Sequence, residues 1–489
     1  MKNFSSSLMW LTVSEVVFNI AAYIVHSVAG RVLGPADYGR YGLVVTLTTM
    51  VIVLIGNGIP TAMSKYVSGV LEKSPGDIRS IKKKTALLQI YIIGGITVLF
   101  FFLAPVIAWA LRDPSLTPLF RISSLIIPAF AAASFYHYYL IGLHLFKLQA
   151  IVKIIRSVAR VGFITVAAIL FGLNGAISGY ILAPLFTFGA ALLIDEFYVK
   201  RKLGYGAKNA LSDFDFPAKT ILAYAGPLTL FLISYELLLT IDLYFVKALL
   251  QDDHLTGLYN AAITIGRIPY YLFAALAMIL LPAISKTTAE KNTEETASLV
   301  NKSLRLMTLL LFPMITLLIA YASQILHFFY GARYDGAADA MNVFAVGVGF
   351  LTVFYVLAFA LNGAGQVKIP MKLAFFGFLG MIALNFLLIP PFGIVGAALA
   401  TTITALFLMI SVLIYTETRF NVRLPVKTIL SSLLCALLIA LLSRFLPQGT
   451  YAFIASGAVL FIAYFGFLKL FGELKTEDLA PFLKLFKKA

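Results

Sequence analysis

Long apolar runs recur along almost the whole chain, and they limit its fold more than any other feature. A helix needs about 20 predominantly apolar residues to cross roughly 30 Å of hydrocarbon. Runs of that length follow one another from Leu8 to near the C-terminus. The composition agrees, because 61% of the 489 residues are hydrophobic and only 12% are charged, against about 25% in a soluble domain. The sequence therefore predicts an all-α integral membrane protein.

About fourteen transmembrane helices are predicted. The first run has no small-residue cleavage site at its end, so we expect it to span rather than to be removed as a signal peptide. The count depends most on the very short connections at 172–174 and 390–392. The predicted spans are 8–29, 41–63, 85–111, 119–142, 150–171, 174–197, 221–247, 258–283, 303–325, 338–361, 371–390, 393–416, 427–445 and 450–471.

The basic residues orient these spans. Of the 38 Lys and Arg, 30 fall on the side that carries both termini, 7 fall on the other side, and Arg267 lies within a span. Cytoplasmic loops are the ones enriched in Lys and Arg, so we expect a multi-pass protein of the cell membrane with both termini cytoplasmic. The net charge of +16 is then a topology signal and does not indicate nucleic acid binding.

Residues of the first six spans recur in spans seven to twelve at a constant offset of 221. Glu15 matches Glu236, Tyr23 matches Tyr244, and Gly172 matches Gly393. An even number of spans per copy makes the repeats parallel, an arrangement in which transporters often bind substrate between two lobes. The predicted domains are an N-terminal six-helix lobe (1–197), a cytoplasmic linker (198–220), a C-terminal six-helix lobe (221–418), two additional helices (419–471) and an amphipathic cytoplasmic tail (472–489).

Four segments carry a family resemblance: Arg31–Gly42, Gly58–Lys65, Leu361–Pro370 and Asn385–Ala397. In their order and with the six-plus-six-plus-two layout, they resemble the polysaccharide-transporter branch of the multidrug/oligosaccharidyl-lipid/polysaccharide (MOP) flippase superfamily. That branch includes O-antigen-unit flippases, the stage V sporulation protein B group and lipid II flippases. The resemblance implies two lobes around a central cavity and transport of a lipid-linked saccharide on an undecaprenyl or dolichyl carrier. The resemblance does not assign a site role to any individual residue of this chain.

Enzyme motifs are absent from the sequence. The one cysteine, Cys435, lies in an apolar run, and the five histidines are scattered without metal-ligand spacing. Nucleotide-binding, zinc-protease and esterase motifs are missing. We therefore expect no catalytic residues, no metal and no cofactor.

Polar residues form similar stripes on the first helix of each lobe. An ionisable side chain in hydrocarbon normally faces a cavity or a partner. The stripes therefore predict two sides of one wet cavity, or else hydrogen bonding between helices within each lobe. They comprise Glu15, Asn19, Tyr23 and His26, and then Glu236, Thr240, Tyr244 and Lys247.

Cations at membrane depth are candidates for binding a substrate phosphate. Lys153, Arg156 and Arg160 share one face of the fifth helix, where they either bind phosphate oxygens or snorkel to the interface. Arg267 lies just before Pro269, which should kink the eighth helix. This arginine either binds phosphate or pairs with Glu236 or Asp242. The acids Glu15, Glu236 and Asp242 either bind H⁺ or Na⁺ to drive transport or neutralise an arginine.

We therefore expect a flippase that translocates a polyprenyl-phosphate- or pyrophosphate-linked oligosaccharide by alternating access, for polysaccharide or cell-envelope biosynthesis. Its expected partners are the lipid-linked saccharide, membrane lipid and H⁺ or Na⁺, and we expect a monomer. The alternative is a cation-coupled multidrug exporter, which would favour a more acidic cavity. A membrane-embedded glycosyltransferase or polymerase is a third hypothesis, which the short non-cytoplasmic loops disfavour.

Overall fold

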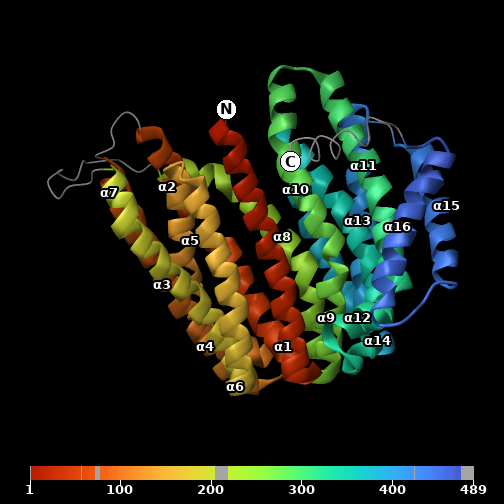
Figure 1. Cartoon of the computed structure of the whole chain (residues 1–489), viewed down its shortest axis with the longest axis horizontal. Helices are drawn as coiled ribbons and strands as arrows, with labels where there is room; N and C mark the ends of the chain where they lie inside the picture. The colour runs from red at the N-terminus through yellow and green to blue at the C-terminus, as the bar shows by residue number, and fades with distance from the viewer. Residues whose placement is uncertain (1, 57, 72–76, 204–217, 423, 475–489) are drawn as a thin grey trace. The chain divides into compact units, whose positions relative to one another are not determined.

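Three of the longest helices double back on themselves at a glycine. The computed structural model describes the chain except for residues 1, 57, 72–76, 204–217, 423 and 475–489 (Figure 1). In α6 (Phe146–Ile194), Gly172 has a positive φ of 60°. A Cβ at Gly179 would lie 2.6 Å from the carbonyl oxygen of Phe163, although a straight helix would separate these residues by about 24 Å. The glycine therefore turns α6 into a hairpin.

The other two hairpins are α1 (Lys2–Gly56) and α14 (Lys368–Phe420). Gly34 reverses α1 with a φ of 73°, so that His26 and Tyr38 come within hydrogen-bond distance. Gly393 reverses α14 with a φ of 57°. Residues other than glycine rarely adopt such a backbone, which explains why these short connections need glycine.

The predicted all-α membrane fold with about fourteen spans is confirmed. Ten helical segments of the described residues are long and apolar enough to cross a membrane. The three hairpins extend over 44, 54 and 53 residues and hold two spans each. Helix α8 (Ala218–Leu250) completes the fourteen.

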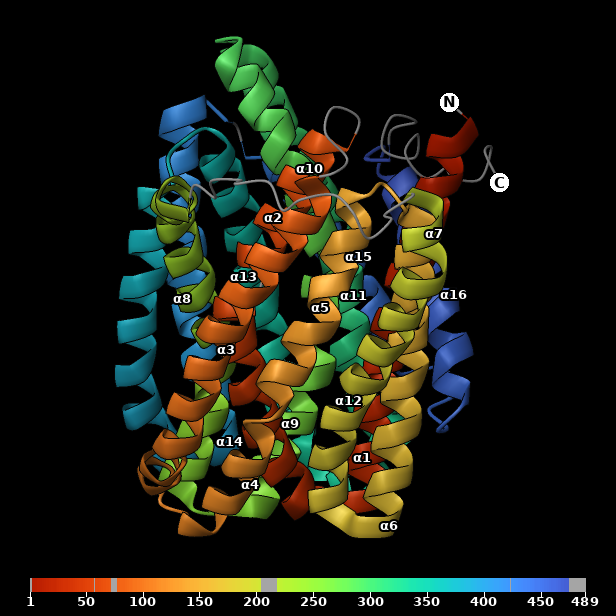
Figure 2. The same cartoon turned by 90° about the vertical axis from the view of Figure 1, so that its left-hand side faces the viewer.

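The chain divides into two compact units. Unit 1 contains residues Met1–Ile233 and Gln251–Gly257. Within this unit, α5 lies beside α2, α3 and α6 (Figure 2). Besides α1, α6 and the first part of α8, its elements are α2 (Gly58–Val70), α3 (Asp77–Ala110), η1 (Pro114–Leu116), α4 (Thr117–Ser123), α5 (Ile126–Gly142), η2 (Asp195–Val199) and α7 (Lys200–Leu203).

Unit 2 contains Ser234–Leu250 and Leu258–Ala489. The two helices outside the repeat, α15 and α16, pack on α11 through buried Leu309, Cys435 and Tyr464. The elements after α8 are α9 (Asp253–Gly266), which begins in unit 1, α10 (Ile268–Ala289), α11 (Thr293–Ala320), α12 (Ala322–Tyr330), η3 (Ala332–Ala337), α13 (Ala338–Gly363), α14, α15 (Val426–Ser443) and α16 (Ala452–Leu470).

The backbone repeats at the same constant offset as the sequence. Gly172 has φ 60° and ψ −138°, and its repeat counterpart Gly393 has φ 57° and ψ −136°. A Cβ at Gly175 would meet the carbonyl oxygen of Ala167, and one at Gly396 would meet that of Leu388. Both members of the second pair are the repeat counterparts of the first. The last hairpin of each six-helix segment, α6 or α14, therefore has the same geometry.

Some element boundaries differ from the predicted spans. Helix α3 begins at Asp77, well before the predicted span at 85–111, where an acidic residue in the first turn favours a helix start. The predicted eighth span is broken at Arg267, between α9 and α10, because Pro269 cannot donate a main-chain hydrogen bond. The predicted linker 198–220 is helical as far as Leu203. Residues 204–217 of that linker and 475–489 of the predicted tail lie outside the described residues.

Candidate functional site

Three cations on α6 surround one aromatic ring of α1. Lys153, Arg156 and Arg160 are spaced three and four residues apart and therefore share a helix face. Their charged groups lie 5.1, 5.8 and 4.5 Å from the centroid of the Phe18 ring. Attraction between a cation and an aromatic face helps to hold such groups away from water. The packing of α1 on α6 thus gathers positive charge within unit 1.

Each of these cations has a different second contact. Lys153 forms an ion pair with Glu15, and Arg156 stacks 4.0 Å from the centroid of the Phe130 ring. Arg160 donates from Nη2 to the carbonyl oxygen of Phe18 at 3.0 Å. Its buried Nε has no hydrogen-bond partner among the described residues. Among the described residues, Glu15 is therefore the one carboxylate that forms an ion pair with these three cations, and the net charge of the cluster is positive.

A cavity of about 200 Å³ opens beside this cluster. Its wall includes Lys153, Arg156 and His137, with the rings of Phe18 and Phe130. The side-chain amide of Gln149 lies 3.2 Å from Nδ1 of His137. A guanidinium can bind phosphate oxygens bidentately, and weak local screening strengthens the contact. Sequence reasoning missed His137, Phe18 and Phe130, because nothing in the local sequence distinguishes them from packing residues.

The polar stripe of α1 divides between two environments. Glu15 contacts the cation cluster, whereas the amide of Asn19 donates to the main-chain oxygen of Glu15 at 2.9 Å. Nδ1 of His26 lies 3.0 Å from the hydroxyl of Tyr38 across the α1 hairpin, and Tyr23 is half-buried. Of this stripe, Glu15 contacts the cation cluster through its side chain, by the ion pair with Lys153.

The second stripe, on α8, is mostly buried inside unit 2. Thr240 donates to the main-chain oxygen of Glu236 at 2.7 Å. Thr240, Tyr244 and Lys247 are all buried, whereas Glu236 is half-buried. These residues do not form a continuous exposed surface.

Asp242 lies off that stripe and is completely buried in unit 2. Its Oδ2 accepts hydrogen bonds from the hydroxyls of Tyr259, at 2.6 Å, and Thr401, at 2.9 Å. Its Oδ1 accepts from the main-chain N–H of Leu243 at 2.8 Å. Tyr259 is the repeat counterpart of Tyr38, a match that singles it out in the sequence, whereas no sequence signal marks Thr401.

Arg267 forms no ion pair with Glu236 or Asp242 among the described residues. Its Nη2 donates instead to the carbonyl oxygen of Leu239, and its Nε is buried without a hydrogen-bond partner in the described part of the chain. Leu239 is the repeat counterpart of Phe18, whose carbonyl accepts from Arg160. In both units, the main-chain oxygen at this repeat position therefore accepts a hydrogen bond from an arginine. The arginine comes from α6 in unit 1 and from the break between α9 and α10 in unit 2.

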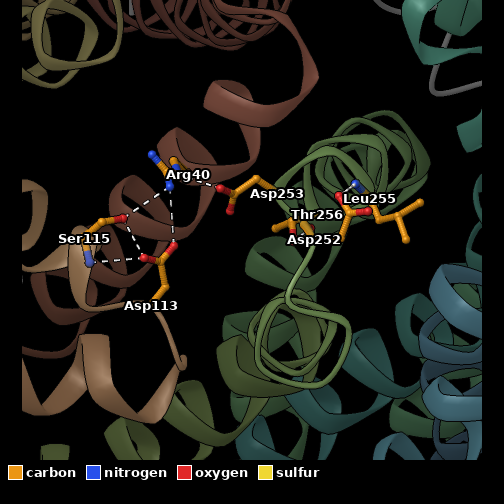
Figure 3. A network of polar contacts seen from close by, with 7 residues as sticks. All are labelled: Arg40, Asp113, Ser115, Asp252, Asp253, Leu255 and Thr256. Carbon is orange, nitrogen blue, oxygen red and sulfur yellow. Dashed lines mark hydrogen bonds and ion pairs between the residues drawn. The ribbon is translucent and has the colours of Figure 1, made fainter.

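A separate ion network holds the start of α9 within unit 1 (Figure 3). Arg40 donates from Nε to Oδ2 of Asp253 at 2.7 Å, and its Nη2 lies 3.6 Å from Oδ2 of Asp113. The same Nη2 donates to the hydroxyl of Ser115 at 3.2 Å. Asp252 caps the helix by accepting from the N–H of Leu255 at 3.0 Å. The network fixes the Gln251–Gly257 segment to unit 1.

Comparisons with known proteins agree with this architecture. The family model described as polysaccharide biosynthesis protein matches residues 5–288, more than half of the chain, and the MatE model matches residues 227–387. Stage V sporulation protein B of Bacillus subtilis is 25% identical over 82% of this chain and 80% of its own. A putative O-antigen transporter of Shigella flexneri is 22% identical over 76% of this chain and 88% of its own.

A solved structure with the same fold is the lipid II flippase MurJ in an inward closed conformation. The TM-score is 0.74 at 16% identity, and the match covers 95% of this chain and 98% of that chain. This structural likeness shows the fold, and the match to the family model shows the family. The chain therefore belongs to the polysaccharide biosynthesis protein family, in the MOP flippase superfamily of multi-pass membrane transporters, and is not an enzyme.

Proposed function

We propose that the protein is a flippase for a saccharide linked to a polyprenyl phosphate or pyrophosphate. The cation-lined cavity of unit 1 is the observation that carries this proposal. Arg156 lines a cavity on a membrane-spanning helix and forms no ion pair among the described residues, although a charge at this depth is costly without a partner. A substrate phosphate would supply that partner. The names of the O-antigen transporter and the lipid II flippase support the same substrate class.

An apolar groove in unit 2 supports the lipid part of this proposal. A cavity of about 480 Å³ lies among α11, α13, α14 and α15. Met307 on α11, Phe350 on α13 and Leu433 on α15 lie in its wall. A polyprenyl chain is apolar throughout and suits such a groove. Helix α15, which lies outside the repeat, thus contributes to the groove wall as well as packing on α11.

An exporter of organic cations is the competing hypothesis. Such a substrate would be repelled by Lys153, Arg156 and Arg160, against which only Glu15 forms a described ion pair. Like charges at low dielectric repel strongly. We therefore favour an anionic head group, which the lobes would carry across the membrane by alternating access.

The test uses purified protein in proteoliposomes with undecaprenyl-pyrophosphoryl N-acetylglucosamine in the inner leaflet. Its arrival outside is followed with a membrane-impermeant lectin. Arg156→Gln should slow transfer at least tenfold, because it removes the phosphate contact while leaving Phe130 in place. Lys286→Gln is the matched control, because Lys286 is exposed and is only 3.9 Å from Glu290. Unchanged transfer by Arg156→Gln, or efflux of ethidium that survives it, would contradict the proposal.

We further propose that Asp242 couples transport to H⁺ or Na⁺. A carboxylate buried in the membrane is the group that a coupling cation would neutralise, and Asp242 already has hydroxyl oxygens of Tyr259 and Thr401 beside it. Asp242→Asn should abolish any acceleration of transfer by an imposed Na⁺ or pH gradient. Tyr259→Phe, which removes one of the two hydroxyl oxygens and keeps the carboxylate, should weaken that acceleration without abolishing it. Gradient dependence that persists in Asp242→Asn would exclude this role.

A further inference from the structure

The two repeats carry different side chains at the position of the cation-lined cavity. Thr49 and Ser134 line that cavity in unit 1. Their repeat counterparts are Tyr270 and Tyr355. Tyr235 likewise replaces Ser14. Three small hydroxyl side chains of unit 1 thus correspond, at the constant sequence offset, to three tyrosines of unit 2.

These tyrosines belong to a cluster on α8, α10 and α13 that we call the aromatic shelf. Tyr355 lies at its centre, with ring centroids 4.6 Å from Tyr235, 5.1 Å from Tyr270 and 4.6 Å from Phe359. Tyr271 continues the cluster 5.3 Å from Tyr270. The shelf is defined as Tyr235, Tyr270, Tyr271, Tyr355 and Phe359.

The shelf has a buried base and an accessible edge. Tyr235 and Tyr355 are 2% and 5% exposed, whereas Tyr271 is 49% exposed and Tyr270 and Phe359 are intermediate. The base therefore fixes the ring positions while the edge stays open to a ligand.

Hydrogen-bonding groups flank the shelf. Glu236 follows Tyr235 on α8, and Arg267 is the N-cap residue of α10, three residues before Tyr270. Arg267 keeps one main-chain contact, to Leu239, while its buried Nε lacks a hydrogen-bond partner among the described residues. An acceptor from a ligand would satisfy that donor. A carboxylate and a guanidinium together can bind hydroxyl groups as acceptor and donor.

We propose that the aromatic shelf binds the saccharide of the substrate, with Glu236 and Arg267 on its hydroxyl groups. A sugar ring presents C–H bonds on its face, which pack on the negative face of an aromatic ring, and presents hydroxyls at its rim. The inference rests on the proposed function. It assigns the sugar to unit 2, where the tyrosines at positions 235, 270 and 355 offer ring faces that the small hydroxyl side chains at the equivalent positions of unit 1 lack.

The experiment compares two probes on full-length protein in nanodiscs. One is undecaprenyl pyrophosphate, and the other is the same lipid carrying N-acetylglucosamine. Tyr271→Ala should weaken binding of the glycosylated probe about tenfold, a typical loss for one stacked ring, and should leave the unglycosylated probe unaffected. Tyr271→Phe should bind both probes like the wild type. Tyr451→Ala is the matched control, because Tyr451 is an exposed tyrosine that contacts Phe328.

The outcomes separate this inference from the function on which it rests. Wild-type protein that binds neither probe would overturn the proposed function, and the shelf assignment with it. Wild-type protein that binds both probes while Tyr271→Ala weakens them equally, or weakens neither, would overturn the shelf assignment alone. Phe359→Ala provides a second variant from a different helix, which should show the same selective loss.

Discussion

Arg160 binds Phe18 twice, through a 3.0 Å hydrogen bond to its carbonyl oxygen and through its guanidinium 4.5 Å from the centre of its ring. The hydrogen bond uses the main chain, so it does not depend on the side chain at position 18. The second repeat illustrates this, because Arg267 donates to the carbonyl oxygen of Leu239, where the side chain is aliphatic. The carbonyl is therefore the constant part of both contacts.

This relationship predicts unequal effects for two substitutions. Phe18→Leu keeps the carbonyl and removes the cation–π contacts of the ring with Lys153, Arg156 and Arg160, so binding of undecaprenyl pyrophosphate should weaken by about two- to fivefold, in line with about 0.5–1 kcal/mol at an exposed site. Arg160→Gln removes the charge and should weaken binding at least tenfold. Equilibrium binding in nanodiscs measures both. Equal losses would mean that the ring, not the carbonyl, positions the arginine.

The ion pair between Arg40 and Asp253 makes a prediction about the start of α9. Asp253→Asn should increase hydrogen exchange of the Gln251–Gly257 amides several-fold, because the segment loses its charged anchor. The side chains of Arg40 and Asp253 are about a third and a fifth exposed, so salt should screen them in part. High salt should therefore raise exchange in the wild type and have little effect on the variant. Hydrogen exchange followed by mass spectrometry measures both effects.

The control for charge is Asp37→Asn, because Asp37 lies on the same α1 hairpin and forms no ion pair among the described residues. This variant should exchange the Gln251–Gly257 amides at the wild-type rate. Exchange that is identical in the wild type and Asp253→Asn would show that packing alone holds the segment.

The hairpin glycines predict a sharp contrast within one helix. A Cβ at Gly175 would lie 1.8 Å from the carbonyl oxygen of Ala167, whereas one at Gly189 would have no heavy atom within 4 Å. Gly175→Ala should therefore prevent folding, because the added methyl group would force the two arms of α6 apart and they would lose their packing. Gly189→Ala should change stability by no more than about 1 kcal/mol. Yield of monodisperse protein in detergent distinguishes the two, and equal yields would contradict the hairpin geometry.

The sequence was sufficient for the fold because each step depended on local chemistry. The length of the apolar runs predicted the spans, and matches at Glu, Tyr and Gly predicted the repeat. Gly172 and Gly393 marked the reversals, because a positive φ is a property of a single residue. The break at Arg267 followed from Pro269 alone. None of these inferences required knowledge of which helices touch.

The candidate site could be predicted only in part, because its contacts join helices distant in sequence. The spacing of Lys153, Arg156 and Arg160 on one face was readable, but their contacts with Phe18 and Phe130 depend on how α6 packs on α1 and α5. Likewise, the donors to Asp242 come from residues 17 and 159 positions away. Local periodicity cannot reveal such pairings.

Glu473 joins the two helices outside the repeat to α11. Its Oε2 accepts from Thr428 at 2.8 Å and lies 3.3 Å from Nη1 of Arg305, and its Oε1 lies 3.2 Å from Nζ of Lys427. Burial alone would raise the pKa of this carboxyl. Hydrogen bonds from Thr428, Lys427 and Arg305 outweigh burial and hold the pKa below its ordinary value.

A pKa lowered by folding means that the ionised carboxylate stabilises the folded protein above the unfolded-state pKa of about 4.3. That contribution is lost as the pH falls through the lower folded-state pKa. Glu473→Gln should therefore reduce the Tm by several degrees at pH 7, and the difference from the wild type should shrink below about pH 4. Glu290→Gln, which removes an exposed carboxylate 3.9 Å from Lys286, should have little effect. Calorimetry in detergent between pH 7 and pH 3 measures the Tm difference between each variant and the wild type. A Tm difference for Glu473→Gln that stays constant with pH would show that packing rather than charge holds the C-terminal helices in place.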